Sequence, residues 1–115
     1  MPFEDPAQRL DDIIDNAGRL RAYTAGMNLT DFLADRKTID AVERCLQRIA
    51  EAARKLGDRY DAGYPELELP ELRKLGSILR RDYDEVRPGL LWGFIQDRLN
   101  GLEAMAKAEL EELDA

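Results

Sequence analysis

The chain contains no histidine and only one cysteine, Cys45, among its 115 residues. A single cysteine excludes an internal disulfide, and zinc sites in proteins are built chiefly from cysteine and histidine side chains. We therefore expect no metal site and no cofactor. Cys45 lies near an apolar stripe, which favours a buried, small hydrophobic side chain.

Long hydrophobic runs are also missing. No stretch approaches the roughly 18 apolar residues of a membrane span, and the N-terminal segment "MPFEDPAQRLDD" lacks the basic and apolar regions of a signal peptide. We expect a cytoplasmic protein that does not contact a membrane. The chain is acidic overall, with a net charge of −7, and this charge disfavours broad, non-specific binding of nucleic acid.

What the sequence does contain is helical periodicity. Hydrophobic residues make up 44% of the chain and charged residues 36%, a composition typical of one globular domain, here residues 1–115. Apolar residues recur at steps of three and four along segments of about 5–25 and 36–56, along a shorter segment of about 71–83, and from Pro88 onward. Thr30 and Asp35 are placed to cap two of the helices, and Gly57 to end one. No strand pattern competes, so we predict an all-α fold, an antiparallel up-down bundle of four to five helices.

One stretch reverses the overall charge. "LRKLGSILRR", residues 72–81, carries four basic residues and no acid. On a helix, Leu72, Leu75, Ile78, Leu79 and Tyr83 share an apolar side, and the opposite side carries basic residues. We predict that Arg73, Arg80, Arg81 and Tyr83 form a cleft for phosphate, RNA or a partner, because guanidinium groups match phosphate oxygens in pairs. The alternative is a solvated helix face with local ion pairs. Glu51, on the preceding long helix, is a candidate contact for the basic helix.

The run "AYTAGMNLTDFLADRKTIDAVERCLQRIAEAARKL" followed by "RRDYDEVRPGLLW" resembles the HepT-like (DUF86) family of the HEPN superfamily. The resemblance implies a dimeric, all-helical protein related to metal-independent ribonuclease toxins, which a minimal nucleotidyltransferase antitoxin neutralises. The family motif R-N-x-x-x-H-x-Y falls on "GSILRRDY". Of its four specified residues the chain keeps only Tyr83, the position at which the resemblance implies adenylylation by the partner enzyme.

The three other motif positions are substituted, by Gly76, Ser77 and Arg81. Arginine cannot take the role of the motif histidine in proton transfer, because a guanidinium group does not lose its proton in proteins. Loss of the motif arginine removes a candidate stabiliser of the charged phosphorus centre. We therefore assign no catalytic residue.

Three interpretations remain open. The preferred one is a HepT-like homodimer that has lost ribonuclease activity and binds a nucleotidyltransferase, with weak RNA binding as a further expectation. The second is an active ribonuclease toxin with a rearranged site, and the third is an unrelated helical scaffold or regulatory protein. The wide apolar stripe of the last helix favours the dimer, since a single small bundle leaves part of it uncovered.

Overall fold

The computed structural model of the chain describes residues 5–81 and 86–115. Within these ranges the chain forms α-helices, one short 3-10 helix and no strand, so the all-α prediction is confirmed. The elements are α1 (Pro6–Thr24), α2 (Leu29–Leu33), α3 (Arg36–Leu56), η1 (Pro65–Leu67), α4 (Leu69–Arg81), α5 (Pro88–Asp97) and α6 (Leu99–Asp114). No helix in these ranges is long and apolar enough to cross a membrane.

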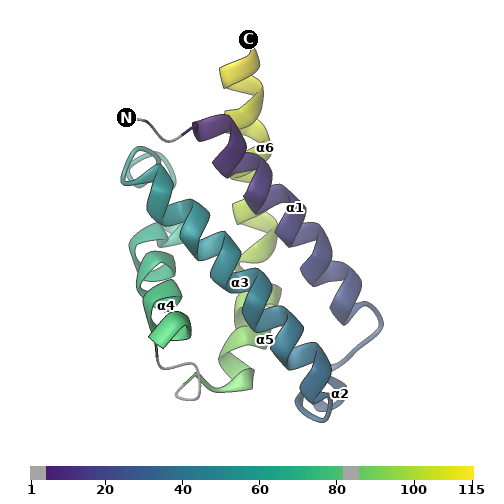
Figure 1. Cartoon of the computed structure of the whole chain (residues 1–115). Helices are drawn as coiled ribbons and strands as arrows, with labels where there is room; N and C mark the ends of the chain where they lie inside the picture. The colour runs from purple at the N-terminus through teal and green to yellow at the C-terminus, as the bar shows by residue number, and fades with distance from the viewer. Residues whose placement is uncertain (1–4, 82–85) are drawn as a thin grey trace.

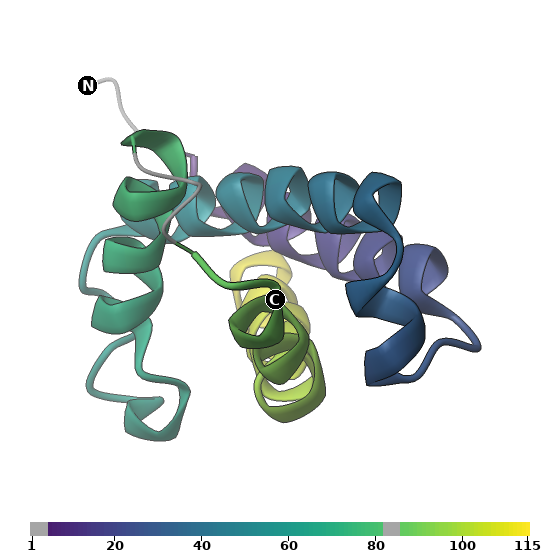
Figure 2. The same ribbon diagram turned by 90° about the horizontal axis from the view of Figure 1, so that it is seen from below.

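Helix α3 is the central element of the bundle. It packs against α1 and α4 and also contacts α2 and α5, while α6 packs on α1. Figure 1 shows α1 and α3 running in opposite directions, with α4 beside the C-terminal half of α3. Figure 2 shows α4 and α2 at opposite edges of the molecule, with α5 and α6 between them. The basic helix α4 therefore has α3 as its main neighbour.

The helix boundaries follow from local hydrogen bonds. The side chain of Asp35 caps α3, and Gly57 ends it with a φ of 68°, as the sequence predicted. The prediction of Thr30 as the cap of α2 is wrong. Asn28 is the cap, and it forms a reciprocal pair of hydrogen bonds with Asp31. Such a pair satisfies two backbone donors at once, which explains why the helix begins earlier than expected.

The single helix expected from Pro88 onward is divided into α5 and α6. The break lies at Arg98, which has a φ of −123° and whose side chain binds Glu68 at 2.7 Å. The buried residues Ile95 and Leu99 flank the break at a spacing of four. Because the apolar period continues through Arg98 without a change of phase, the sequence pattern carried no sign of the break.

The core is formed by the stripes that the periodicity indicated, from α1, α3 and α6 together with parts of α4 and α5. Cys45 is 1% exposed and belongs to this core, as expected. Trp92 packs its ring against Phe32, with 5.3 Å between the ring centroids, and thereby joins α5 to α2. The largest fully buried side chains are Phe32, Leu10, Ile13, Leu20, Leu46, Ile49, Leu72, Leu79, Leu91, Leu99, Leu102 and Met105.

Candidate functional site

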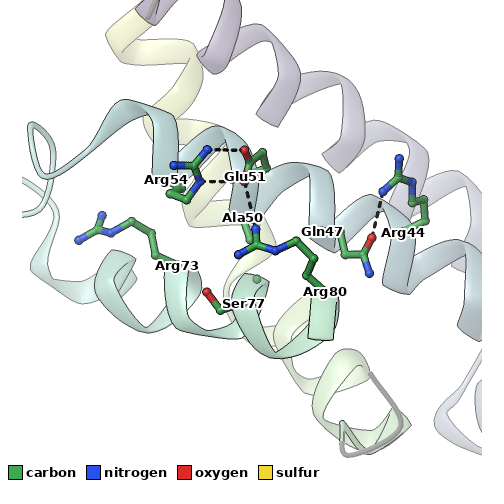
Figure 3. A pocket seen from close by; sticks show the side chains of 9 residues that line it. Arg44, Gln47, Ala50, Glu51, Arg54, Arg73, Ser77 and Arg80 are labelled. Carbon is green, nitrogen blue, oxygen red and sulfur yellow. Dashed lines mark hydrogen bonds and ion pairs between the residues drawn. The ribbon is translucent and has the colours of Figure 1, made fainter. Parts of the chain in front are cut away.

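A polar groove of about 190 Å³ lies between α3 and α4. Figure 3 shows side chains from both helices around it, with most of the charged groups supplied by arginine. The groove is open to solvent, and Ala50 and Gly76 lie at its floor, where the two helices meet. Its lining residues are Arg44, Gln47, Ala50, Glu51, Arg54, Arg73, Gly76, Ser77 and Arg80.

The floor of the groove depends on a glycine. Gly76 is buried, and a Cβ atom added to it would lie 2.5 Å from the Cβ of Ala50. Carbon atoms pack at about 3.5–4.0 Å, so only glycine at position 76 allows α3 and α4 to approach this closely. Gly76 is therefore a packing residue in this chain, at a position where the resemblance places a catalytic arginine.

Glu51 joins the two walls of the groove. Its carboxylate accepts two hydrogen bonds from Arg54, at 2.9 and 2.6 Å, and lies 3.5 Å from Nη1 of Arg80 on α4. The expected contact between Glu51 and the basic helix is confirmed. The hydrogen bonds from Arg54 lower the pKa of Glu51, and the nearby positive charges, including that of Arg80, lower it further. Glu51 is therefore ionised near neutral pH.

Gln47 connects the groove wall to the end of α4. Its amide nitrogen donates a hydrogen bond to the carbonyl oxygen of Leu79 at 3.0 Å, and its amide oxygen accepts one from Arg44. This contact supplies a donor to a carbonyl near the C-terminus of α4, where helix carbonyls lack partners within the helix. It also holds Arg44 at the rim of the groove.

Arg73 acts mainly as an anchor for the chain that follows α3. Its guanidinium donates two hydrogen bonds to Asp61, at 3.0 and 2.7 Å, and one to the carbonyl oxygen of Gly57. The hydrogen bond from Arg73 lowers the pKa of Asp61. Figure 3 shows the Arg73 guanidinium directed away from Glu51. The predicted cleft residue thus contributes a wall, and its charge is already paired.

The other predicted cleft residues differ in position. Arg80 lines the groove, whereas Arg81, the exposed last residue of α4, is not among the lining side chains of the described ranges. Tyr83 lies outside the described residues, so its place in the cleft and its modification stay predictions. Ile78, assigned to the apolar side of the helix, is 40% exposed, because the buried face of α4 passes through Gly76.

Of the α3 wall, the sequence interpretation singled out only Glu51. Arg44, Gln47, Glu51 and Arg54 follow one another at spacings of three, four and three, which places them on one face of α3. This polar stripe was visible in the sequence. The role of this stripe in the groove was not visible, because a polar helix face usually meets solvent. The sequence does not indicate that α4 packs beside it.

The charged side chains that line the groove are mostly positive. Four guanidinium groups and one carboxylate line the groove, and two of the four, those of Arg54 and Arg80, lie beside the carboxylate of Glu51. Among residues 5–81 and 86–115, no cluster of three or more carboxylate or thiol side chains is arranged to hold a metal ion. The arrangement thus supports charge-assisted hydrogen bonds, and Glu51, which accepts hydrogen bonds from Arg54, is the one carboxylate among the lining residues.

The family described as Ribonuclease HepT-like matches residues 13–109. The chain belongs to the HepT-like family. The resemblance noted in the sequence is therefore confirmed, and no solved structure matches the chain.

Several relatives of this HepT-like chain carry ribonuclease names. "Putative RNase MJ0127" of Methanocaldococcus jannaschii is 28% identical over 99 residues, which are 86% of this chain and 82% of that protein. "Probable ribonuclease HepT" of Thermococcus cleftensis is 28% identical over 94 residues, 82% of this chain and 86% of that protein. "Gamma-glutamylcyclotransferase and putative RNase MJ0434" of Methanocaldococcus jannaschii is 28% identical over 105 residues, 91% of this chain but 47% of that longer protein.

Proposed function

We propose that this HepT-like chain acts by binding and does not cleave RNA, and that its partner is a minimal nucleotidyltransferase in a toxin–antitoxin pair. The observation that carries the loss of cleavage is the contact between Gly76 and Ala50. An arginine at position 76 would meet the Cβ of Ala50 at 2.5 Å, so the helices would have to move apart to admit it. This contact supports the proposal, because close packing would exclude an arginine from the position to which the resemblance assigns the motif arginine.

The proton-transfer group is absent as well. Arg81 stands where the family motif has histidine, and the chain contains no histidine that could replace it. A positioned acid–base group contributes roughly 10² to 10⁴ in rate, and a group that stabilises developing charge contributes a separate, large factor. Loss of both groups supports the proposal that this protein does not cleave RNA measurably. The names of its relatives, in contrast, describe those proteins as ribonucleases.

The cleavage assay that tests this proposal uses the intact protein and a single-stranded RNA without added metal. We expect no cleavage by the natural chain. Cleavage that is lost in Arg81→Ala would overturn the proposal and favour the active ribonuclease with a rearranged site. The triple variant Gly76→Arg, Ser77→Asn and Arg81→His, which restores the motif, should not cleave RNA, because Ala50 blocks position 76. Adding Ala50→Gly to these three changes gives the matched test of that explanation.

The proposed partner is tested by co-purification. A nucleotidyltransferase encoded beside this chain should form a stable complex with it, and incubation of that complex with ATP should transfer an adenylyl group to the hydroxyl of Tyr83 with release of pyrophosphate. The mass increase should be absent in Tyr83→Phe, the variant that removes only the acceptor hydroxyl. A complex that forms without any mass increase would limit the partner's role to contact, and the absence of a complex would contradict the partnership.

We further propose that the chain is a homodimer. A hollow of about 330 Å³ between α4 and α5 is lined by Leu75, Leu90 and Phe94 among others, and Leu90 is 64% exposed. Exposed apolar surface of this kind is typical of interaction sites. Light scattering should give the mass of two chains, and Leu90→Glu should reduce it to one. Leu33→Glu, at an exposed leucine on α2, is the matched control that should leave the dimer intact.

A further inference from the structure

Helix α5 packs closely on its α2 side and faces a hollow on its α4 side. Figure 2 shows α5 between these two helices. Toward α2, the ring of Trp92 contacts the ring of Phe32, with 5.3 Å between the centroids. Toward α4, α5 borders the hollow of about 330 Å³. The packing of α5 is therefore asymmetric.

The side of α5 that borders the hollow carries two small residues. Gly89 and Gly93 lie one helical turn apart, and a Cβ atom added to either would meet nothing within 4 Å. Leu90 and Phe94 line the hollow beside them, and Leu75 lines it from α4. Space is thus available for α5 to approach α4. Such an approach would remove apolar surface from water, which is favourable.

The joint between α5 and α6 has the features of a pivot. Arg98 has a φ of −123° and a ψ of −21°, outside the helical values. Its amide donates a hydrogen bond to the carbonyl oxygen of Phe94 at 2.9 Å, and its carbonyl oxygen accepts one from Leu102 at 3.1 Å. Hinges are commonly residues at the ends of helices that absorb changes in backbone angles. A small change of angle at Arg98 can therefore keep both hydrogen bonds.

An ion pair fixes this joint at its observed angle. The guanidinium of Arg98 donates a hydrogen bond to Glu68 at 2.7 Å. Glu68 follows η1 and directly precedes α4, so the ion pair ties the joint to the α4 side. Within residues 5–81 and 86–115, Glu68 is the one non-glycine residue with a positive φ, 51°. A backbone of this kind costs energy and persists where surrounding contacts hold it.

We propose that α5 is a flap that pivots at Arg98 to close over the hollow, and that the ion pair with Glu68 latches it open. Its consequence rests on the proposed homodimer, because closure covers the apolar surface that a second copy covers in the dimer. Closure and dimerisation therefore exclude each other, and the latch favours dimerisation. The side chains are 26% exposed for Arg98 and 54% for Glu68. Ion pairs at such exposure are weak, so the latch is readily released.

The first test follows Trp92, the single tryptophan of the chain, at a protein concentration where light scattering gives one chain's mass. Closure moves Trp92 away from Phe32. Glu68→Gln should therefore shift the tryptophan emission to longer wavelength and increase its quenching by acrylamide. Glu66→Gln, which removes the same charge two positions earlier in η1, should change neither. The charge swap Glu68→Arg with Arg98→Glu should restore the natural emission.

The second test measures dimerisation by light scattering over a dilution series. Glu68→Gln should weaken the dimer by up to about fivefold, the equilibrium ratio for one exposed ion pair, and the charge swap should restore it. Weakening by Arg98→Gln but not by Glu68→Gln, with natural Trp92 fluorescence in both, would mean that Arg98 contacts the second copy directly, and the flap would be refuted.

The two tests also separate the flap from the homodimer. A chain that stays monomeric at every concentration, but whose Trp92 emission responds to Glu68→Gln, would contradict the homodimer and support the flap. A normal dimer whose Trp92 emission is the same in Glu68→Gln, Arg98→Gln and the natural chain would support the homodimer and refute the flap.

Discussion

The contact between Gly76 and Ala50 makes a quantitative prediction for Gly76→Ala. Alanine is normally more favourable than glycine inside a helix, by about 1 kcal/mol. Here the added methyl group would lie 2.5 Å from the Cβ of Ala50. Both carbons are attached directly to helix backbones, so neither can rotate away. The clash should therefore cost about 2–3 kcal/mol, the upper part of the range for overpacking. The net result should be a loss of stability of about 1–2 kcal/mol.

The same substitution should have the opposite effect once Ala50 is replaced by glycine. The remaining atoms of residue 50 lie 3.7 and 3.8 Å from the added methyl group, which is an ordinary contact distance. In the Ala50→Gly background, Gly76→Ala should stabilise the protein by about 1 kcal/mol through helix propensity alone. The coupling free energy between the two positions is then about 2–3 kcal/mol.

Urea unfolding followed by circular dichroism at one fixed protein concentration measures all four members of this cycle. Gly18→Ala is the matched control, because Gly18 is an exposed residue within α1 and its added Cβ meets nothing within 4 Å. That variant should be more stable than the natural chain. If Gly76→Ala stabilises the protein as Gly18→Ala does, the close approach of α3 and α4 is wrong, and with it the reason for excluding arginine at position 76.

Two further predictions concern individual side-chain hydrogen bonds. Asn28→Ala should destabilise the protein by about 1 kcal/mol because it removes the cap of α2. Thr30→Ala should change the free energy of unfolding by only a few tenths of a kcal/mol, and the reverse order would restore Thr30 as the cap. The hydroxyl of Tyr64 donates a hydrogen bond to Glu109 at 2.6 Å, and this bond raises the pKa of Tyr64 to about 12. A folded-state pKa above the unfolded value of about 10 means that the resulting stability is present below pH 10 and is lost as the pH rises toward 12. The stability difference between the natural chain and Tyr64→Phe should shrink over this interval, and a constant difference would contradict the assigned hydrogen bond.

The sequence by itself was sufficient to predict where most helices lie in the chain, because local features specify each of those helices. The period of the apolar residues predicted α1 and α3, and Asp35 and Gly57 marked the ends of α3 through hydrogen bonding and backbone conformation that involve only nearby residues. The absence of histidine was equally visible, and it determined the expectation of no conventional cleavage without any structure.

The candidate site depended on tertiary structure. Periodicity identifies which residues share a face of a helix, but it does not identify the helix that packs against that face. Only the packing of α3 against α4 brought Arg54 and Glu51 opposite Arg80, and only the chain that follows α3 placed Asp61 beside Arg73. The Glu51–Arg80 and Asp61–Arg73 pairs each join two different elements, so their formation depends on how those elements pack. Gly76 illustrates this limit most clearly, because glycine is required there by the Cβ atom of Ala50, 26 positions earlier in the chain.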